Sequence, residues 1–241
     1  MSLMSIAPFF PKCLLARIKS VKLESFSGFG MTDTVSRIAD ALFNSGCLKF
    51  GQFKIKSGAL SPYYVDLAGL LSSPEELCRV AEAAADEVRR IGAVERIDRL
   101  ASIELRGALL LPSVACRAGL PCVVVRKESK AYGVTGRIVG EVVKGERVLF
   151  FDDVVSEGLT KLEGIRPLEE LGARVEHVLV VVDREQGGRE NLERLGYRVH
   201  ALAKVSELVE SLSRSDRISE DQAHAVLSYV KECKKKPTQS T

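Results

Sequence analysis

Three short runs of mostly apolar residues constrain the fold of this chain more than any other feature. Residues 122–125, 148–151 and 175–182 are rich in β-branched or aromatic side chains. Such runs are typical of parallel strands that are covered on both faces. Because the segments between them carry helical periodicity, the sequence predicts an α/β fold whose central sheet is mostly parallel.

The remaining elements follow the same alternation. Pro74 stands where the first position of a helix is expected, and Pro167 should bend or interrupt a helix at residues 159–171. Further strands are predicted at residues 50–55, 63–67, 97–103 and 199–203, and further helices at residues 32–45, 74–91, 107–117, 191–195 and 219–230. Neither a G-x-G-x-x-G nor a G-x-x-x-x-G-K-[ST] loop occurs, so two common nucleotide-binding folds lose support.

We expect one domain over residues 31–230, between two segments of different character. Residues 1–30 contain Pro8 and Pro11 and show no clear period. They are interpreted either as an extension without fixed structure or as residues upstream of the true start at Met31. Their basic residues follow the apolar stretch, which is not the order of a signal peptide. Residues 231–241 are expected to form a basic, polar tail.

Charge and composition exclude several classes of function. The chain has 35 basic and 32 acidic residues, and a net charge of +3 is too small to indicate nucleic-acid binding. No run approaches the ~18 apolar residues of a membrane span. The six cysteines form no C-x-x-C pair, so we expect free thiols in a reducing compartment. The sequence therefore predicts a cytoplasmic protein whose partners include neither nucleic acid nor a membrane.

The first candidate ligand site follows the apolar run at residues 148–151. Asp152 and Asp153 come directly after this run, and residues 156–160 read Ser-Glu-Gly-Leu-Thr before the next predicted helix. Open α/β sheets bind ligands at the carboxyl ends of their strands, and the amides at a helix start can hold a phosphate. Two carboxylates above such amides suit a substrate with a phosphate, a ribose and a metal ion. A helix cap with a spare surface carboxylate explains the same residues equally well.

Three more polar clusters lie where predicted strands end or turn. Residues 126–140 are rich in glycine and basic side chains, as expected of a loop that closes over polyphosphate or of an ordinary charged hairpin. Residues 183–191 include Arg184, whose guanidinium can bind a carboxylate through two hydrogen bonds. A turn with a helix cap is the alternative there. Residues 53–64 include Lys56 and Tyr64, which either line a ligand pocket or belong to a plain strand pair.

Together these clusters resemble orotate phosphoribosyltransferases, over about residues 31–230. The matching segments are FKIKSG and SPYY, ELRG, RKESKAYG, DDVVSEG and DREQGGREN. The double-aspartate loop alone is typical of all type I phosphoribosyltransferases. The K-S-G…S-P-Y segment, the R-K-x-x-K loop and D-R-x-x-G-G are together specific to the orotate branch. The resemblance implies a type I phosphoribosyltransferase fold, with helices flanking the sheet and a small N-terminal hood.

The resemblance also implies an activity in pyrimidine biosynthesis. These glycosyltransferases join orotate to phosphoribosyl pyrophosphate with Mg²⁺, giving orotidine 5′-monophosphate and pyrophosphate, and they are homodimers with shared active sites. The implied catalytic residues are Lys130, Asp152 and Asp153, and no side chain is assigned as a direct ligand of the metal. The residues implied to bind phosphoribosyl pyrophosphate are Arg106, Arg126, Lys127, Lys130, Tyr132, Asp152, Asp153, Ser156, Gly158 and Thr160. Those implied to bind orotate are Lys56, Tyr64, Val65, Ser156 and Arg184.

Two positions in the loop after the aspartates depart from the family pattern. Glu157 places a carboxylate where a phosphate is expected, and Leu159 replaces a small or hydroxyl-bearing residue. Two hypotheses therefore stand. The chain is either a working transferase, which the retained aspartates and Lys130 favour, or a divergent and catalytically weak or inactive member with a nucleotide-binding or regulatory role.

Overall fold

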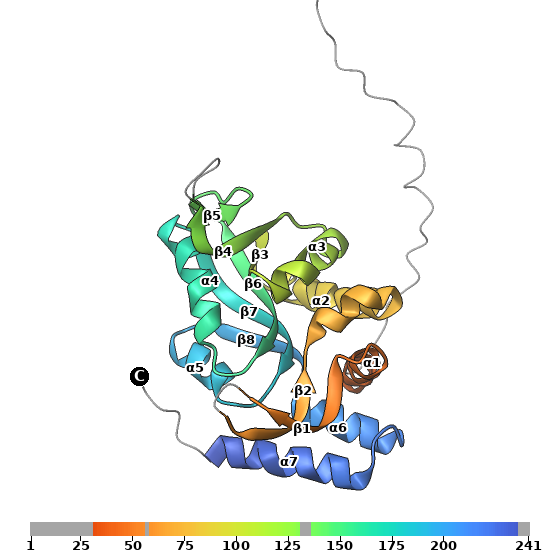
Figure 1. Ribbon diagram of the computed structural model, residues 1–241. Coiled ribbons are helices and arrows are strands. Elements are labelled where there is room, and N and C mark those ends of the chain that lie inside the picture. Colours follow the sequence, from red (N-terminus) through yellow and green to blue (C-terminus); the bar gives the residue numbers. More distant parts are fainter. Residues whose placement is uncertain (1–30, 56–57, 131–135, 236–241) are drawn as a thin grey trace, which may run out of the picture. The chain divides into compact units, whose positions relative to one another are not determined.

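A computed structural model describes residues 31–55, 58–130 and 136–235 of the chain. Its centre is a six-stranded sheet in the order β5-β4-β3-β6-β7-β8, shown in Figure 1. The strands are β3 (Arg99–Ile103), β4 (Cys122–Lys130), β5 (Gly136–Val139), β6 (Arg147–Val155), β7 (Arg174–Asp183) and β8 (Arg198–Lys204). All pairings are parallel except that of β5 with β4. The prediction of a mostly parallel sheet is therefore confirmed.

Helices cover both faces of this sheet, which explains why its strands are apolar on both sides (Figure 1). The first face packs against α1 (Met31–Asn44), α2 (Pro74–Gly92), α3 (Arg106–Ala118), α6 (Val205–Arg214) and α7 (Glu220–Lys235). The second face packs against α4 (Leu159–Glu170) and α5 (Gly188–Arg194). Successive side chains of β6 alternate between the two cores, with Phe150 in the second and Phe151 in the first.

A separate two-stranded antiparallel sheet forms the small N-terminal hood that the resemblance implied. It consists of β1 (Leu48–Lys54) and β2 (Leu60–Val65), and the 3₁₀ helix η1 (Leu67–Ser72) connects it to α2. β2 lies against α7, where the rings of Tyr63 and Tyr229 meet edge to face with centroids 6.0 Å apart. The last helix thus supports the hood from the far end of the sequence.

Of the two outcomes that the sequence left open at Pro167, a bend or an interruption, α4 does not show the interruption. The helix runs through Pro167, which cannot donate to the carbonyl of Glu163 one turn earlier. Arg137 of β5 supplies the missing donor, because its Nη2 lies 3.2 Å from that carbonyl oxygen. A contact that is distant in sequence therefore compensates for the proline.

The carboxyl-terminal part differs from the prediction in two further ways. α6 is a helix that was not predicted from the sequence, and its first turn is capped by a hydrogen bond from the Lys204 amide to the Glu207 carboxylate. α7 extends beyond the expected boundary at Val230, and its Lys234 pairs with Glu185 at 2.8 Å. The first residues of the expected tail are therefore part of the domain.

Two broader expectations can be checked against the described residues. Their five cysteines, Cys47, Cys78, Cys116, Cys122 and Cys233, are all free thiols. Within the same ranges, every helix is too short or too polar to cross a membrane. The segment at residues 1–30 lies outside the part of the chain that the structure describes.

Two helical glycines make a matched test of the packing around β6. A Cβ on Gly164 of α4 would lie 2.6 Å from Phe150 Cζ, whereas one on Gly92 of α2 would meet nothing within 4 Å. Gly164→Ala should therefore lower the free energy of unfolding by about 1–3 kcal/mol through overpacking. Gly92→Ala should raise it by up to about 1 kcal/mol, since alanine favours the helix. Urea unfolding of both variants measures the difference, and equal effects would contradict this packing.

Candidate active site

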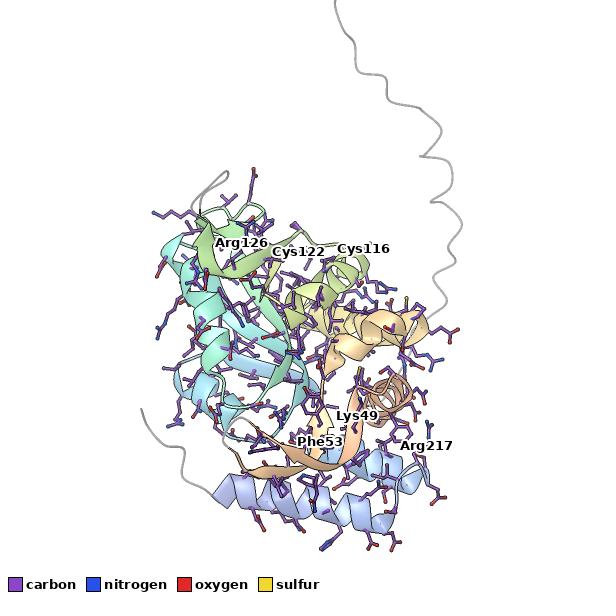
Figure 2. The ribbon with its side chains drawn as sticks, viewed as in Figure 1. Lys49, Phe53, Cys116, Cys122, Arg126 and Arg217 are labelled. Atoms are coloured by element: carbon purple, nitrogen blue, oxygen red, sulfur yellow. The ribbon has the colours of Figure 1, made fainter. Side chains whose placement is uncertain are left out.

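The polar clusters of the sequence meet at one edge of the central sheet. β3, β4, β6 and β7 are parallel, so their carboxyl ends lie together. Arg106 and Arg184 follow β3 and β7, Asp153 lies near the end of β6, and Arg126 lies in β4 just beyond its pairing with β3. Figure 2 labels Arg126 on the hairpin that β4 forms with β5. Four separate stretches of sequence are thereby brought to a single site.

Asp152 and Asp153 are nearly buried at the end of β6, with 4% and 6% of their surfaces exposed. Asp152 Oδ2 lies 2.6 Å from the Nζ of Lys161 in α4, and its Oδ1 accepts the Asp153 amide at 2.9 Å. Lys161 was not predicted as a site residue, because a lysine early in a helix usually lies on a solvated face.

Gly107 leaves no spare room around the Asp152 carboxylate. A Cβ at this first-turn position of α3 would lie 2.2 Å from Asp152 Oδ1 and 2.4 Å from Ser102 Oγ. Any side chain there would displace the carboxylate or the helix. The glycine of the ELRG segment is therefore required for steric reasons.

Asp153 has an unusual protonation equilibrium. Burial raises the pKa of its carboxyl, the negative charge of Asp152 raises it further, and Lys161 opposes both, which leaves the pKa at about 7. The charge of Arg106, in α3, also interacts with that of Asp153. The carboxylate pair therefore changes charge near neutral pH.

The loop between β6 and α4 has the shape of a phosphate-binding loop. Gly158, at φ +88°, caps α4, whose first backbone N–H groups have no acceptor within the helix. The Gly188 amide donates to the Ser156 carbonyl at 2.8 Å, and Asn191 Nδ2 donates to the Glu157 carbonyl at 2.9 Å. Hydrogen bonds to residues of α5 thus hold the loop in place. The backbone N–H groups at the start of α4 indicate an anion-binding site.

Gly158 and Gly188 cannot be replaced by a residue with a side chain without a steric clash. A Cβ on Gly188 would lie 2.5 Å from the Ser156 carbonyl oxygen and 2.8 Å from the Gly158 nitrogen. One on Gly158 would lie 2.9 Å from the Gly188 carbonyl oxygen. The loops after β6 and β7 can approach each other only because both positions lack a side chain. Beside them, Glu157, Leu159 and Thr160 are exposed.

Arg184 lies beside Ser156, as expected of two residues on one ligand. Its Nη1 is 3.3 Å from Ser156 Oγ, and its Nε is 3.4 Å from the Tyr63 hydroxyl. The guanidinium carbon also lies 5.3 Å from the centroid of the Tyr63 ring. Burial raises the pKa of Tyr63. Tyr63 is therefore a site residue that the sequence analysis passed over in favour of its neighbour Tyr64.

Tyr64 and Val65 occupy different places on the hood. Tyr64 is exposed and packs its ring 5.6 Å from that of Phe53, which Figure 2 labels on β1, whereas Val65 is buried. Asp66 follows them and binds Arg106 through two hydrogen bonds of 2.7 and 2.9 Å. The hydrogen bond from Arg106 lowers the pKa of Asp66. Asp66 is a second missed residue, since it joins the hood to the start of α3.

The β4–β5 hairpin carries the remaining cationic residues. The Lys127 amide donates to Glu104 Oε1 at 2.6 Å, and Arg137 Nε donates to the Arg126 carbonyl at 2.9 Å. Lys130 is the last residue of β4, where its backbone pairs with Gly136. Lys56 and Tyr132 lie outside the described residues.

The opposite end of the sheet also carries a polar cluster. His177 Nδ1 is 3.0 Å from His200 Nε2, His177 Nε2 is 3.2 Å from Glu95, and His200 Nδ1 is 3.5 Å from Glu87. Ligand atoms of His177, Glu95 and Glu176 lie within 4.8 Å of one another, as in a metal site. Arg198 already bridges the two carboxylates, so its guanidinium supplies the positive charge there.

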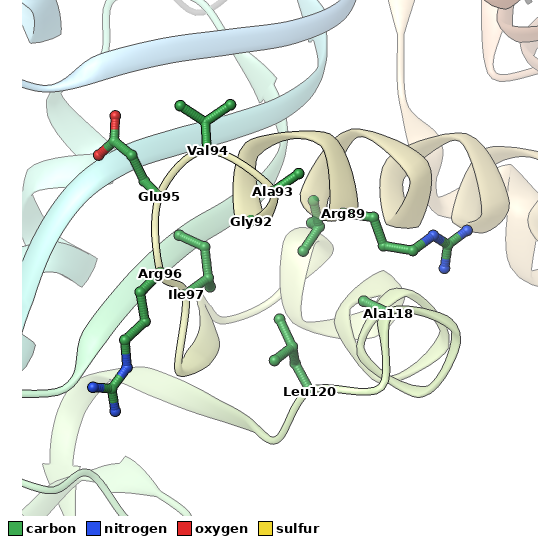
Figure 3. A pocket seen from close by; sticks show the side chains of 10 residues that line it. Arg89, Gly92, Ala93, Val94, Glu95, Arg96, Ile97, Ala118 and Leu120 are labelled. Carbon is green, nitrogen blue, oxygen red and sulfur yellow. The ribbon is translucent and has the colours of Figure 1, made fainter. Parts of the chain in front are cut away.

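A hollow of about 560 Å³ also lies far from the aspartates. It is bordered by the end of α2 and by the residues that lead into β3 and β4 (Figure 3). Its lining includes Ala93, Ile97, Ala118 and Leu120, with Arg89 and Arg96 beside them. This hollow has neither the paired carboxylates nor the glycine-containing loops that lie at the carboxyl ends of the strands. The candidate active site is therefore at the carboxyl ends.

The chain resembles known proteins over most of its length. The family model of the phosphoribosyl transferase domain matches residues 67–196 of this chain. The orotate phosphoribosyltransferase of Pyrococcus abyssi is 36% identical over 170 residues, which cover 70% of this chain and 92% of that protein. That of Sulfolobus acidocaldarius is 34% identical over 190 residues, which cover 79% and 94%.

Solved structures show the same relationship. The UMP synthase of Leishmania donovani superposes with a TM-score of 0.75 and 32% identity, covering 84% of this chain and 43% of that one. The orotate phosphoribosyltransferase of Aeropyrum pernix gives 0.64 and 28%, covering 73% and 98%. The chain belongs to the phosphoribosyltransferase family, in its orotate phosphoribosyltransferase branch.

The raised pKa of Asp153 predicts a pH dependence of stability. As the pH rises from 5 to 8, the folded state releases from Asp153 a proton that the unfolded state, with a pKa of 3.8, has already lost, so stability falls until the pH passes about 7. The wild type should lose about 2–3 kcal/mol over that range relative to Asp153→Asn. Urea unfolding of both proteins at several pH values isolates the difference. Parallel stability curves would contradict the assignment.

Proposed function

We infer that this protein transfers the phosphoribosyl group of phosphoribosyl pyrophosphate to orotate, giving orotidine 5′-monophosphate and pyrophosphate. The observation that carries this inference is the meeting, at one sheet edge, of the aspartate pair, the phosphate-type loop and Arg184 beside Ser156. The kinship with orotate phosphoribosyltransferases supports it. The alternative, an inactive regulatory member, is not favoured, because the aspartates and the glycine contact of the loop are retained.

The loop after β6 would hold the 5′-phosphate. The amides of Gly158, Leu159 and Thr160 would provide donors, and the positive end of the helix dipole favours an anion. Ser156 and Thr160 would add hydroxyl donors. Because this phosphate does not react, the contacts serve mainly to bind and orient the substrate.

The aspartates would act on the ribose. Departure of pyrophosphate leaves positive charge on the sugar, and a carboxylate beside the ring stabilises that transition state. Both Asp152 and Asp153 would bind near the ribose hydroxyls. Their burial strengthens the electrostatic effect, since charges interact more strongly away from water.

Orotate would lie between Arg184 and the hood. A guanidinium can bind a carboxylate through two parallel hydrogen bonds, and Tyr63 holds the Arg184 side chain from its other side. Ser156 would contact orotate as well as the phosphate. Lys56, Tyr64 and Val65 remain predicted residues of this pocket.

The pyrophosphate would be bound by cations of the β3–α3 junction and of the β4–β5 hairpin. Arg106 is already held in place by Asp66, while Arg126, Lys127 and Lys130 lie on β4. A cation at the leaving group offsets its growing negative charge, which is the role proposed for Lys130. Tyr132 is proposed to lie in the same loop.

Mg²⁺ is proposed as the cofactor and would arrive bound to phosphoribosyl pyrophosphate. Asp152 is already paired with Lys161, and the other groups at the edge are mainly amides and cations that suit phosphate oxygens. The residues present therefore fit a metal whose ligands are substrate oxygens and water. The ion would neutralise part of the charge of the leaving pyrophosphate.

Two features of assembly and location belong to the same proposal. We expect a homodimer in which the β4–β5 hairpin of one subunit reaches the other subunit's site. We also expect a cytoplasmic location, because free thiols such as the described cysteines persist in a reducing compartment.

Ligand binding and turnover together test the function. Phosphoribosyl pyrophosphate with Mg²⁺ should raise the melting temperature of the wild type, by the equivalent of about 2.7 kcal/mol at 100 times Kd. Changing both Asp152 and Asp153 to Asn should abolish this shift, whereas Asp221→Asn, on an exposed position of α7, should keep it. Adding orotate should then yield orotidine 5′-monophosphate. A wild type that binds without turnover would revive the regulatory alternative.

Mixing two inactive variants tests the shared site. If Lys130 acts in the neighbouring subunit, a Lys130→Ala chain mixed with an Asp152→Asn, Asp153→Asn chain should regain activity. Up to one of the two sites in each mixed dimer would then have both parts. Mass spectrometry should confirm that mixed dimers form, and mixed dimers without activity would show that each site is built from one chain.

A further inference from the structure

We propose that Lys161 is a positioning residue of the active site. Its ammonium group fixes Asp152 as an ion pair on the α4 side of β6, and Asp153 is thereby the carboxylate that takes up and releases the proton of the pair. This role rests on the proposed function, because the pair is taken to act on the ribose. It assigns to α4 a part in setting the pH range of the reaction.

The geometry of the pair is that of a closed contact. Lys161 Nζ lies 2.6 Å from Asp152 Oδ2, and both side chains are nearly fully buried. The other oxygen, Oδ1, accepts the Asp153 amide and lies against Gly107. Both oxygens of Asp152 therefore have donors, and the carboxylate has no free direction in which to rotate.

The place of Lys161 in α4 runs against the local preference of the helix. It is in the first turn, where the helix dipole favours anions and disfavours cations. Lysine is also among the residues least often buried, unless it is paired. A buried cation at this point contributes little to the helix itself, and its close contact is with Asp152. Local rules broken in this way are expected at functional sites.

Removing the cation would change the charge balance at Asp153. The charged groups that interact with Asp153 are Asp152 on its own strand, Lys161 on α4 and Arg106 on α3. Two neighbouring carboxylates without a cation bind a shared proton more tightly. Lys161 opposes that effect, so it keeps Asp153 ionised at a lower pH than the pair alone would allow. Since the ionised carboxylate stabilises the cationic sugar, Lys161 extends the activity toward acid.

Three variants separate charge from packing. The pH profile of kcat/KM for phosphoribosyl pyrophosphate is measured for Lys161→Met, Lys161→Arg and the control Lys204→Met, whose lysine forms an exposed pair with Glu207. Lys161→Met should move the acid limb upward by about one pH unit, which is about tenfold lower activity on that limb. Lys161→Arg, which keeps the charge, and Lys204→Met should both keep the wild-type limb.

The proposal is overturned if Lys161→Met loses activity equally at every pH with its limb unmoved, or if Lys161→Arg moves the limb as Met does. Either outcome would mean that the side chain acts through its volume. These pH profiles of kcat/KM require an active enzyme.

A second measurement uses the folded wild type and needs neither turnover nor the Lys161 variants. Carbon-13 NMR of aspartate carboxyl groups should show one signal that titrates near neutral pH, and this signal should vanish in Asp153→Asn. A neutral titration that persists in Asp153→Asn, or none in the wild type, overturns the proposal. An inactive wild type that gives the expected titration would instead reject the proposed function alone.

Discussion

The burial of β6 on both faces is the constraint on which the rest of the structure depends. Its side chains alternate between the two cores, so each must match a different layer of helices. At the sheet edge the strand places the buried Asp152 between the two layers of helices. Its Oδ2 pairs with Lys161 of α4, and its Oδ1 leaves room only for a glycine at Gly107 of α3. The Asp153 carboxyl is buried beside this ion pair.

The ligand loops depend on each other in the same way. The loop after β6 and the loop after β7 touch through Ser156 and Gly188, and Arg184 extends from the second loop to the first. The hood is attached separately, through Asp66 and Arg106 at one point and Tyr63 and Tyr229 at another. Glu157 and Leu159, which depart from the family pattern, are exposed, so neither occupies the glycine contact that shapes the loop.

The sequence predicted the sheet and several residues that meet at the candidate site, and it did so for a physical reason. Strands covered on both faces need continuous apolar runs, and Arg184 and Ser156 both follow such runs, so their meeting could be expected. Lys161 and Tyr63 could not be recognised in this way. A lysine in a helix and a tyrosine in a strand have the same pattern whether they are buried against a partner or solvated. α6 was missed for a related reason, since its start is fixed by Glu207 and its apolar residues were not assigned a period.

The histidines at the far end of the sheet have a consequence for the charge of the folded protein. His177 lies between His200 Nε2 at 3.0 Å and Glu95 at 3.2 Å, and its side chain is nearly buried. A neutral imidazole has one ring hydrogen, so it can donate to only one of these two neighbours. Burial lowers the pKa of His177, which favours this neutral ring. The net charge of +3, which counts every histidine as neutral, therefore agrees with the surroundings of His177 in the folded protein.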